Sequence, residues 1–218
     1  MNGNAFNSQF DSDDVKFEEI NRRYSGFFKI DEYVFQHALF EGGVSDIVKR
    51  EILERGDAVA VLPYDPVEDK IVFIEQLRIG ALRTKSSPWL LEVVAGMIDK
   101  PESAERVAIR EAKEEAGLEI NQLIPMLSYL SSPGGTSERL YLFLGIVDSN
   151  NAGGVFGLAE EQEDIKVHVL DYEESMTLLE KGVIDNAATV ICMQWLALNK
   201  SKLPAKLKGM NKVESEAN

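Results

Sequence analysis

A chain of 218 residues with 44% hydrophobic content can bury the core of one generous domain and a small appendage. Its formal net charge of −14 argues against DNA or an anionic membrane as a partner, because both attract a basic surface. No apolar run reaches the ~18 residues that span a bilayer, the N-terminus resembles no secretory signal, and one cysteine, Cys192, cannot form an internal disulfide. We therefore expect a cytoplasmic enzyme that binds neither nucleic acid nor membrane.

The first quarter of the chain is predicted to form short strands behind a disordered N-terminus. Residues 1–14 are polar, whereas residues 15–54 carry strand-like runs with a turn at Gly42-Gly43. Such a small β region buries little surface alone, so we expect it to pack on a partner subunit or on the main domain. The main domain is expected over residues 55–200, followed by a flexible tail at 201–218.

The main domain is predicted to mix strands and helices. Strand-like runs cover residues 57–64, 70–78 and 89–98, and three more, EINQLIPMLSYL, RLYLFLGIV and IKVHVL, follow the first helix. YEESMTLLEKG and a run from about residue 186 to 199 have helical spacing. Because no regular βαβ alternation is present, the order of elements predicts an α+β fold with a mixed sheet between helices.

A helix between Ser103 and Gly117 is predicted to gather three glutamates. Ser103 is a good N-cap, and Gly117 stands where a helix commonly ends with a positive φ. Glu111, Glu114 and Glu115 then share one side of the helix. Like charges at this spacing repel by roughly 0.2–0.5 kcal/mol per pair, so the arrangement needs a compensating charge.

Basic residues of the same helix do not obviously supply that charge. Arg106, Arg110 and Lys113 are expected to project elsewhere. A bound divalent cation would relieve the repulsion, and carboxylate oxygens suit Mg²⁺ or Mn²⁺ better than zinc. A solvated acidic helix face is the alternative, since charge runs are usually solvated.

Two polar loops and two arginines are further candidates. GLAEEQED, residues 157–164, follows a glycine-rich segment that could close over a substrate, although an acidic surface loop is the alternative. SSPGGTSER, residues 131–139, has strong turn chemistry. Arg50 and Arg78 are surface charges by default, although in so acidic a protein arginines could also bind an anionic ligand.

The acidic helix and its approach loop together resemble the box that marks the Nudix hydrolases. Nine positions agree over 23 residues, namely Gly96, Glu102, Arg110-Glu111-Ala112, Glu114-Glu115 and Gly117-Leu118. The resemblance covers residues 23–199, and Pro133, sixteen residues after Gly117, is typical of the branch of the family that acts on ADP-ribose. It implies a Nudix α/β/α sandwich with a mixed sheet, plus a small N-terminal antiparallel β region.

The resemblance also implies a metal centre and a catalytic base. Two or three Mg²⁺ or Mn²⁺ ions would be held by positions that match the backbone carbonyl of Ala95 and the side chains of Glu111, Glu115 and Glu163. Glu161 matches the general base, with Glu160 as the neighbouring alternative, and Glu114 matches a further ligand or a supporting base. Arg110 would orient the carboxylates beside it, and Glu102 would be structural.

Substrate contacts are implied in the same way. The family's substrate-binding positions match Phe27, Arg50, Arg78, Met97, Pro133, Gly134 and Glu138. Phe27, or Phe28 beside it, would stack on adenine from the exchanged N-terminal region of a homodimer, whereas a core phenylalanine on a strand is an equally good interpretation of the residue itself.

The resemblance therefore implies a metal-dependent ADP-ribose diphosphatase that releases AMP and ribose 5-phosphate. Two alternatives remain open at this point. Another nucleoside diphosphate linked to a second group, such as a nucleotide sugar or a dinucleotide, could be the substrate. A non-catalytic ADP-ribose sensor is the other, although the intact box and the lack of a basic patch disfavour it.

Overall fold

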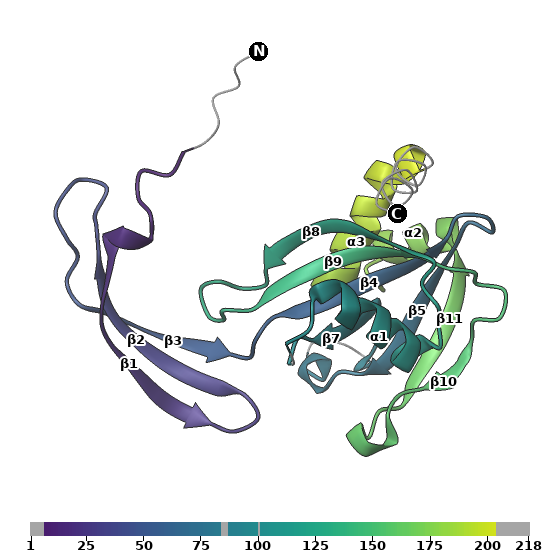
Figure 1. The fold of residues 1–218 in the computed structure, drawn as a ribbon, viewed down its shortest axis with the longest axis horizontal. Coiled ribbons are helices and arrows are strands. Elements are labelled where there is room, and N and C mark those ends of the chain that lie inside the picture. The colour runs from purple at the N-terminus through teal and green to yellow at the C-terminus, as the bar shows by residue number, and fades with distance from the viewer. Residues whose placement is uncertain (1–6, 84–86, 100, 204–218) are drawn as a thin grey trace, which may run out of the picture. The chain divides into compact units, whose positions relative to one another are not determined.

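The computed structural model describes residues 7–83, 87–99 and 101–203, and these residues form two compact units. The first unit comprises the chain up to Gly56 together with Leu130–Glu138, and the second comprises Asp57–Tyr129 and the chain from Arg139 onward (Figure 1). None of the described helices has the length and apolar character that crossing a membrane requires.

The first unit is built on a three-stranded antiparallel sheet. After a 3-10 turn, Ser12–Asp14, the strands β1 (Val15–Ser25), β2 (Lys29–His37) and β3 (Val48–Glu54) pair in the order β1-β2-β3. The loop of residues 131–138 joins this unit through backbone hydrogen bonds with Leu53, which donates to the Gly135 carbonyl at 2.9 Å.

The second unit is organised by an eight-stranded mixed sheet. Its main path runs β10-β11-β5-β4-β9-β8, with β6 paired to β5 and β7 paired to β4. Only the pairing of β4 with β9 is parallel among the registers that the described residues define. The strands are β4 (Ala58–Asp65), β5 (Lys70–Leu77), β6 (Trp89–Glu92), β7 (Val94–Met97), β8 (Gln122–Leu130), β9 (Arg139–Ile146), β10 (Gly154–Phe156) and β11 (Ile165–Asp171).

Helices cover both faces of this sheet (Figure 1). The box helix α1 (Ala104–Ala116) packs on one face, and α2 (Tyr172–Glu180) and α3 (Ala187–Asn199) pack on the other. Short 3-10 turns lie at Ile79–Ala81, Ala159–Glu161 and Lys200–Lys202.

The alternation of side chains along the strands divides the core into two layers. On β4, Val59 and Val61 point to the α1 layer, whereas Ala60 and Leu62 point to the α3 layer. All four are fully buried. This architecture confirms the predicted α+β fold with a mixed sheet between helices and a small antiparallel β region before it.

Candidate functional site

Helix α1 begins and ends where its capping residues require. The Ser103 hydroxyl accepts a hydrogen bond from the Arg106 amide at 3.4 Å, and Gly117 follows the helix with φ of 64°. Its apolar side, including Val107, Ala108 and Ala112, is buried in the sheet. Glu115 is buried on this same side, and Glu111 lies one turn before it, so the packing of α1 fixes where their carboxylates lie.

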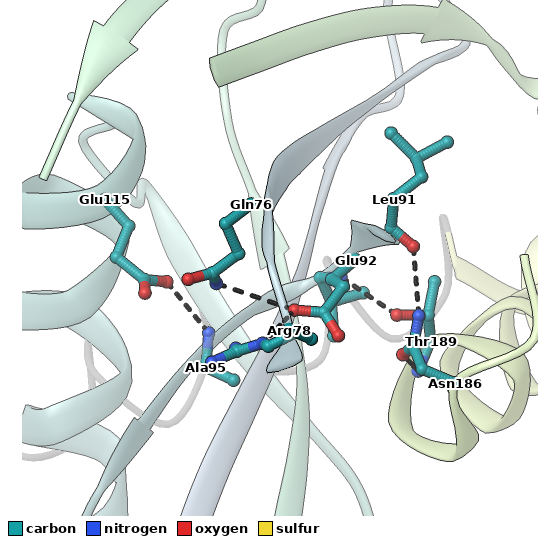
Figure 2. A network of polar contacts seen from close by, with 9 residues as sticks. Gln76, Arg78, Leu91, Glu92, Ala95, Glu115, Asn186 and Thr189 are labelled. Carbon is teal, nitrogen blue, oxygen red and sulfur yellow. Dashed lines mark hydrogen bonds and ion pairs between the residues drawn. The ribbon is translucent and has the colours of Figure 1, made fainter. Parts of the chain in front are cut away.

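Glu115 is the most buried of these glutamates, at 3% exposure. Its Oε2 accepts a hydrogen bond of 3.1 Å from the backbone amide of Ala95, in β7 (Figure 2). Burial, together with the negative charges of Glu111 and Glu163, raises the pKa of Glu115 to about 8 against the effect of that hydrogen bond. The surroundings of Glu115 therefore disfavour its ionised form, and a cation bound nearby would favour it.

Glu111 lies one turn earlier and directly against Gly96. A Cβ atom on Gly96 would stand 2.1 Å from Oε1 of Glu111, so any side chain there would displace the carboxylate. Burial raises the pKa of Glu111 to about 7; the charge of Arg110 opposes this, and those of Glu114 and Glu163 add to it. The glycine thus admits the carboxylate to the strand end that carries Ala95.

Arg110 is placed differently from the prediction that it would project away from the glutamates. Its Nη1 lies 2.9 Å from Glu111 Oε1 and 2.9 Å from Glu114 Oε2, and its Nε lies 3.5 Å from Glu102 Oε2. The prediction is wrong because the long side chain reaches forward along the helix to Glu114, at i+4, and also contacts Glu102 in the preceding loop. Arg110 relieves part of the repulsion among the glutamates.

Glu163, in the acidic loop of residues 157–164, adds a carboxylate whose charge acts on the glutamates of α1. Glu163 Oε2 accepts a hydrogen bond from the Leu158 amide at 3.2 Å, and its charge acts on both Glu111 and Glu115. Glu161 ends the 3-10 turn Ala159–Glu161, but its side chain lies outside the part that the structure describes. Its role as the base stays a prediction.

Arg78 directly follows β5 and is held by a residue that sequence reasoning did not single out. Its Nε donates to Oε2 of Glu92, in β6, at 2.7 Å, and the Gln76 amide lies 3.5 Å from the same oxygen (Figure 2). The positive charge of Arg78 also lowers the pKa of Glu115, against the dominant effect of burial. Glu92 had a detectable signal, since it is the one acidic residue in the apolar run 89–98.

Met97 ends β7, where it pairs with Ala58, and is half-buried. It follows Gly96 and Ala95 on the strand that faces α1, so three predicted site residues share one short strand. Met97 therefore lies two residues after Ala95, whose amide donates to Glu115. The predicted contact of Met97 with the substrate stays a prediction.

The remaining predicted substrate residues belong to the first unit. Phe27 is 84% exposed in the turn between β1 and β2, where it packs edge-on against Phe28 with ring centroids 4.9 Å apart. The core alternative for Phe27 is therefore excluded. Arg50 is an exposed residue of β3 whose Nη1 donates to the Lys49 carbonyl at 2.7 Å.

The loop that carries Pro133, Gly134 and Glu138 is anchored to β3. Glu138 is buried and forms an ion pair with Arg55, whose Nε lies 3.1 Å from Glu138 Oε1. The Arg55 guanidinium also stacks over the Phe28 ring at 5.3 Å. Arg55 was missed by sequence reasoning because its partner is 83 residues away and no local pattern links them.

The donor set of the second unit fits a hard divalent cation. Carboxylate oxygens of Glu111, Glu115 and Glu163 and the strand end at Ala95 offer only oxygen ligands on this side of α1, which is the chemistry of Mg²⁺ and Mn²⁺. Within the described ranges no three His, Cys, Asp or Glu side chains are already drawn together around one point. The close approach of Glu111 to Gly96 and the burial of Glu115 with few positive partners are the observations that fit an ion.

Comparison with known proteins assigns the class. The NUDIX domain family matches residues 54–191, and the chain belongs to this family. The fold is shared by a solved ADP compounds hydrolase with a TM-score of 0.66 at 20% identity, over 86% of this chain and 95% of that one.

Curated relatives narrow the class. The ADP-ribose pyrophosphatase of Escherichia coli (strain K12) is 53% identical over 194 residues, covering 89% of this chain and 93% of the relative. The ADP-ribose pyrophosphatase of Haemophilus influenzae is 48% identical over 197 residues, covering 89% and 91%. A GDP-mannose pyrophosphatase of Cronobacter sakazakii is 35% identical over 156 residues, covering 69% and 78%.

Proposed function

We propose that this chain hydrolyses the diphosphate bond of ADP-ribose to AMP and ribose 5-phosphate in a reaction that depends on divalent metal. The observation that carries the proposal is the pair of carboxyl groups of Glu111 and Glu115, one helical turn apart at Gly96 and Ala95, whose pKa values burial raises because few positive partners face them. Two relatives that are 53% and 48% identical to this chain are ADP-ribose pyrophosphatases, which supports ADP-ribose as the substrate.

The metal centre would consist of Glu111, Glu115, Glu163 and the Ala95 carbonyl. Mg²⁺ or Mn²⁺ bound there, two or three ions per site, would polarise the diphosphate and lower the pKa of water. Glu114 would support the centre through Arg110, whose Nη1 bridges Glu111 and Glu114 at 2.9 Å each. The chain's own contribution is to place these carboxylates on α1 and on the acidic loop before the substrate arrives.

Glu161 would accept the proton of the attacking water. As the water oxygen bonds to phosphorus, the bridging P–O bond breaks and its electron pair leaves with the departing phosphate group. Arg78 would hold the diphosphate by charge-assisted hydrogen bonds beside Glu115. A high net negative charge makes such placed cations necessary, since the whole-protein field repels the substrate.

The first unit would supply the nucleoside and ribose contacts. Phe27 is exposed as an adenine-stacking residue must be, and Glu138 is fixed by its ion pair with Arg55. We propose that the protein is a cytoplasmic homodimer whose subunits exchange their N-terminal regions. Phe27 and Glu138, with Arg50, Pro133 and Gly134, would then complete the substrate pocket. Light scattering should give a dimer at micromolar concentration; a monomer that is fully active would contradict the exchange.

The activity is tested with purified protein, ADP-ribose and Mg²⁺ or Mn²⁺, with AMP and ribose 5-phosphate separated by ion-exchange chromatography. Both products should form in equal amounts, and EDTA should abolish their formation. Turnover without metal, or binding of ADP-ribose without any hydrolysis, would contradict the proposal, and the second result would favour a sensor.

The base is tested with Glu161→Gln and its matched neighbour Glu160→Gln. We expect Glu161→Gln to lower kcat far more than it raises KM, because the proton transfer occurs in the transition state. Glu160 is exposed on the same 3-10 turn, and its variant should retain activity. The reverse pattern would assign the base to Glu160.

A nucleotide sugar is the second candidate substrate, because the Cronobacter sakazakii relative is a GDP-mannose pyrophosphatase. The same assay with GDP-mannose decides between the two. We expect kcat/KM for ADP-ribose to exceed that for GDP-mannose by about a hundredfold, the scale of discrimination from one altered contact in a pocket. A preference for GDP-mannose would reassign the substrate and leave the metal centre intact.

A further inference from the structure

We propose that Glu92 is a positioning residue that orients the guanidinium of Arg78 toward the diphosphate. The inference rests on the proposed function and deepens it, because it names the side chain that sets the geometry of the phosphate-binding arginine. Glu92 lies in β6 and Arg78 follows β5, so the pair joins neighbouring strands on the side of the sheet that α1 covers (Figure 2).

The contact is specific to one atom of the guanidinium. Arg78 Nε donates to Glu92 Oε2 at 2.7 Å, a short charge-assisted hydrogen bond. Because a guanidinium is planar, fixing Nε also fixes the plane and direction of Nη1 and Nη2, which lie outside this hydrogen bond. A diphosphate needs two donors in a defined fork, so orientation matters as much as charge.

Glu92 and Arg78 differ in how far their side chains are buried. The side chain of Glu92 is 11% exposed, whereas that of Arg78 is 44% exposed. Burial raises the pKa of Glu92, and the charge and hydrogen bond of Arg78 oppose this. The buried carboxylate therefore depends on Arg78, and Arg78 is held from the inside while part of it faces solvent.

The strand that carries Glu92 is itself fastened on the opposite face of the sheet. Val93 lies in the break between β6 and β7, and its amide donates to the buried hydroxyl of Thr189 at 2.9 Å. Asn186 caps α3 by accepting from the Thr189 amide at 3.1 Å and donates to the Leu91 carbonyl at 3.0 Å. Both neighbours of Glu92 are thereby tied to the N-terminus of α3.

One short segment consequently serves both halves of the site. Residues 91–95 carry the anchors to α3, the carboxylate that holds Arg78 and the Ala95 amide that donates to Glu115 (Figure 2). This segment therefore sets the position of Arg78 relative to helix α1. A carboxylate at position 92 is needed for the arginine half only, which makes the two halves separable by substitution.

The test is a double-mutant cycle with Glu92→Gln and Arg78→Ala. Affinity for the non-hydrolysable α,β-methylene analogue of ADP-ribose with Mg²⁺ is measured by calorimetry, beside KM and kcat for ADP-ribose. Glu92→Gln should weaken binding and raise KM about tenfold to a hundredfold, the range for a lost charge-assisted hydrogen bond, with a smaller change in kcat. In the Arg78→Ala background the same substitution should change affinity less than about twofold.

Two comparisons separate positioning from general damage. Glu75→Gln is the matched control, since Glu75 pairs with Leu91 in the same two strands and its carboxylate contacts His168 at 2.8 Å; it should keep wild-type affinity. The Mn²⁺ affinity of the Glu92→Gln protein, measured by electron paramagnetic resonance, should also stay within about twofold, because its metal ligands are untouched.

A third variant tests the geometry without altering the buried carboxylate. Arg78→Lys keeps the charge but has no Nε–H to meet Glu92 and no planar fork. We expect its affinity for the analogue to fall nearly as far as that of Arg78→Ala. Wild-type affinity in Arg78→Lys or in Glu92→Gln, or independent effects that multiply in the double variant, would overturn the inference.

Wild-type turnover reports on the proposed function separately. A wild type that binds the analogue but does not hydrolyse ADP-ribose removes the diphosphatase and leaves the positioning role of Glu92 to be decided by the binding cycle. A wild type that neither binds nor hydrolyses overturns both.

Discussion

Glu115 in α1 and Asp65 at the end of β4 are 3% and 2% exposed, but their surroundings differ. Oδ1 of Asp65 accepts from the amides of Val67 and Glu68 at 2.9 and 3.2 Å, and Oδ2 accepts from the amide and hydroxyl of Ser149 at 2.9 and 2.8 Å. Among the described residues Glu115 has one hydrogen bond, from Ala95.

Because of this difference, the pKa values of Asp65 and Glu115 shift in opposite directions. Burial opposes ionisation at both sites, but the hydrogen bonds from Ser149, Glu68 and Val67 outweigh it at Asp65 and lower its pKa. At Glu115 burial prevails and raises the pKa to about 8. The carboxylate of Asp65 is satisfied within the protein, whereas that of Glu115 is not, as we expect of the metal ligand that we propose it to be.

The comparison is tested most severely by Glu115→Gln. We expect kcat to fall roughly a thousandfold at saturating Mg²⁺, because losing a ligand removes several kcal/mol of charge stabilisation from the transition state. In EDTA the variant should melt no lower than the wild type, since a neutral amide replaces a buried carboxyl whose ionised form is disfavoured there. Activity and calorimetric melting are measured on the same preparation.

Glu105→Gln is the control for this change. Glu105 is exposed in the first turn of the same helix, and its variant should match the wild type in both measurements. Near-wild-type turnover of Glu115→Gln would refute its assignment as a ligand, and a large drop in melting temperature would show that Glu115 serves the fold.

Local sequence signals predicted the element that carries Glu115. Ser103 and Gly117 cap α1 as expected, and the acidic side of the helix follows from the spacing of its residues alone. The fold class followed from the order of strands and helices, and membership of the Nudix family is confirmed by the domain match. These features depend on contacts within a few residues, which a sequence displays directly.

Contacts between distant segments were not predictable in the same way. Asp65 meets Ser149 across 84 residues, and Arg78 meets Glu92 only because β5 and β6 pair in one register. The error at Arg110 has a related cause, since the sequence shows the helical position of a side chain but not the direction in which a long one bends. Partner choice depends on packing, which is absent from a single sequence.

Asp65→Asn is the opposite test of the comparison. We expect it to lower the free energy of unfolding at pH 7 by about 2–3 kcal/mol, because an amide group would face donors that now meet a carboxylate oxygen. kcat/KM should be unchanged at a temperature where both proteins are folded. Urea unfolding and steady-state kinetics provide the two numbers, and a selective loss of kcat would show that Asp65 takes part in function.

The pH dependence of the same pair has a defined sign. The pKa of Asp65 is lower in the folded protein than in the unfolded chain, where it is about 3.9. Its contribution to stability is therefore complete above the unfolded pKa and is lost as pH falls through the folded one. The stability difference between wild type and Asp65→Asn should shrink as pH falls below about 4. A difference that grows in acid would contradict the assigned shift.

Gly96→Ala probes how closely the incomplete carboxylates are placed. A Cβ atom at Gly96 would meet the Glu111 side chain at 2.1 to 2.4 Å, so the carboxylate must move while the backbone stays. We expect Mn²⁺ affinity and kcat/KM to fall about tenfold, the lower end of the effect of a displaced ligand. Melting temperature should change little, and Gly134→Ala, with open space around its Cβ, is a control for Mn²⁺ affinity.

Arg55→Met removes the positively charged partner of a third carboxylate, that of Glu138. Glu138 is buried beside Arg55, so removing the guanidinium would leave its charge with a weaker set of partners. Because the side chain of Arg55 is 32% exposed, solvent screens the loss, and we expect about 1 kcal/mol of destabilisation and about a threefold rise in KM. Lys16→Met, which breaks the exposed pair with Glu18 in the same unit, should change neither quantity. Equal effects of the two substitutions would show that burial of Glu138 gives its ion pair no special weight.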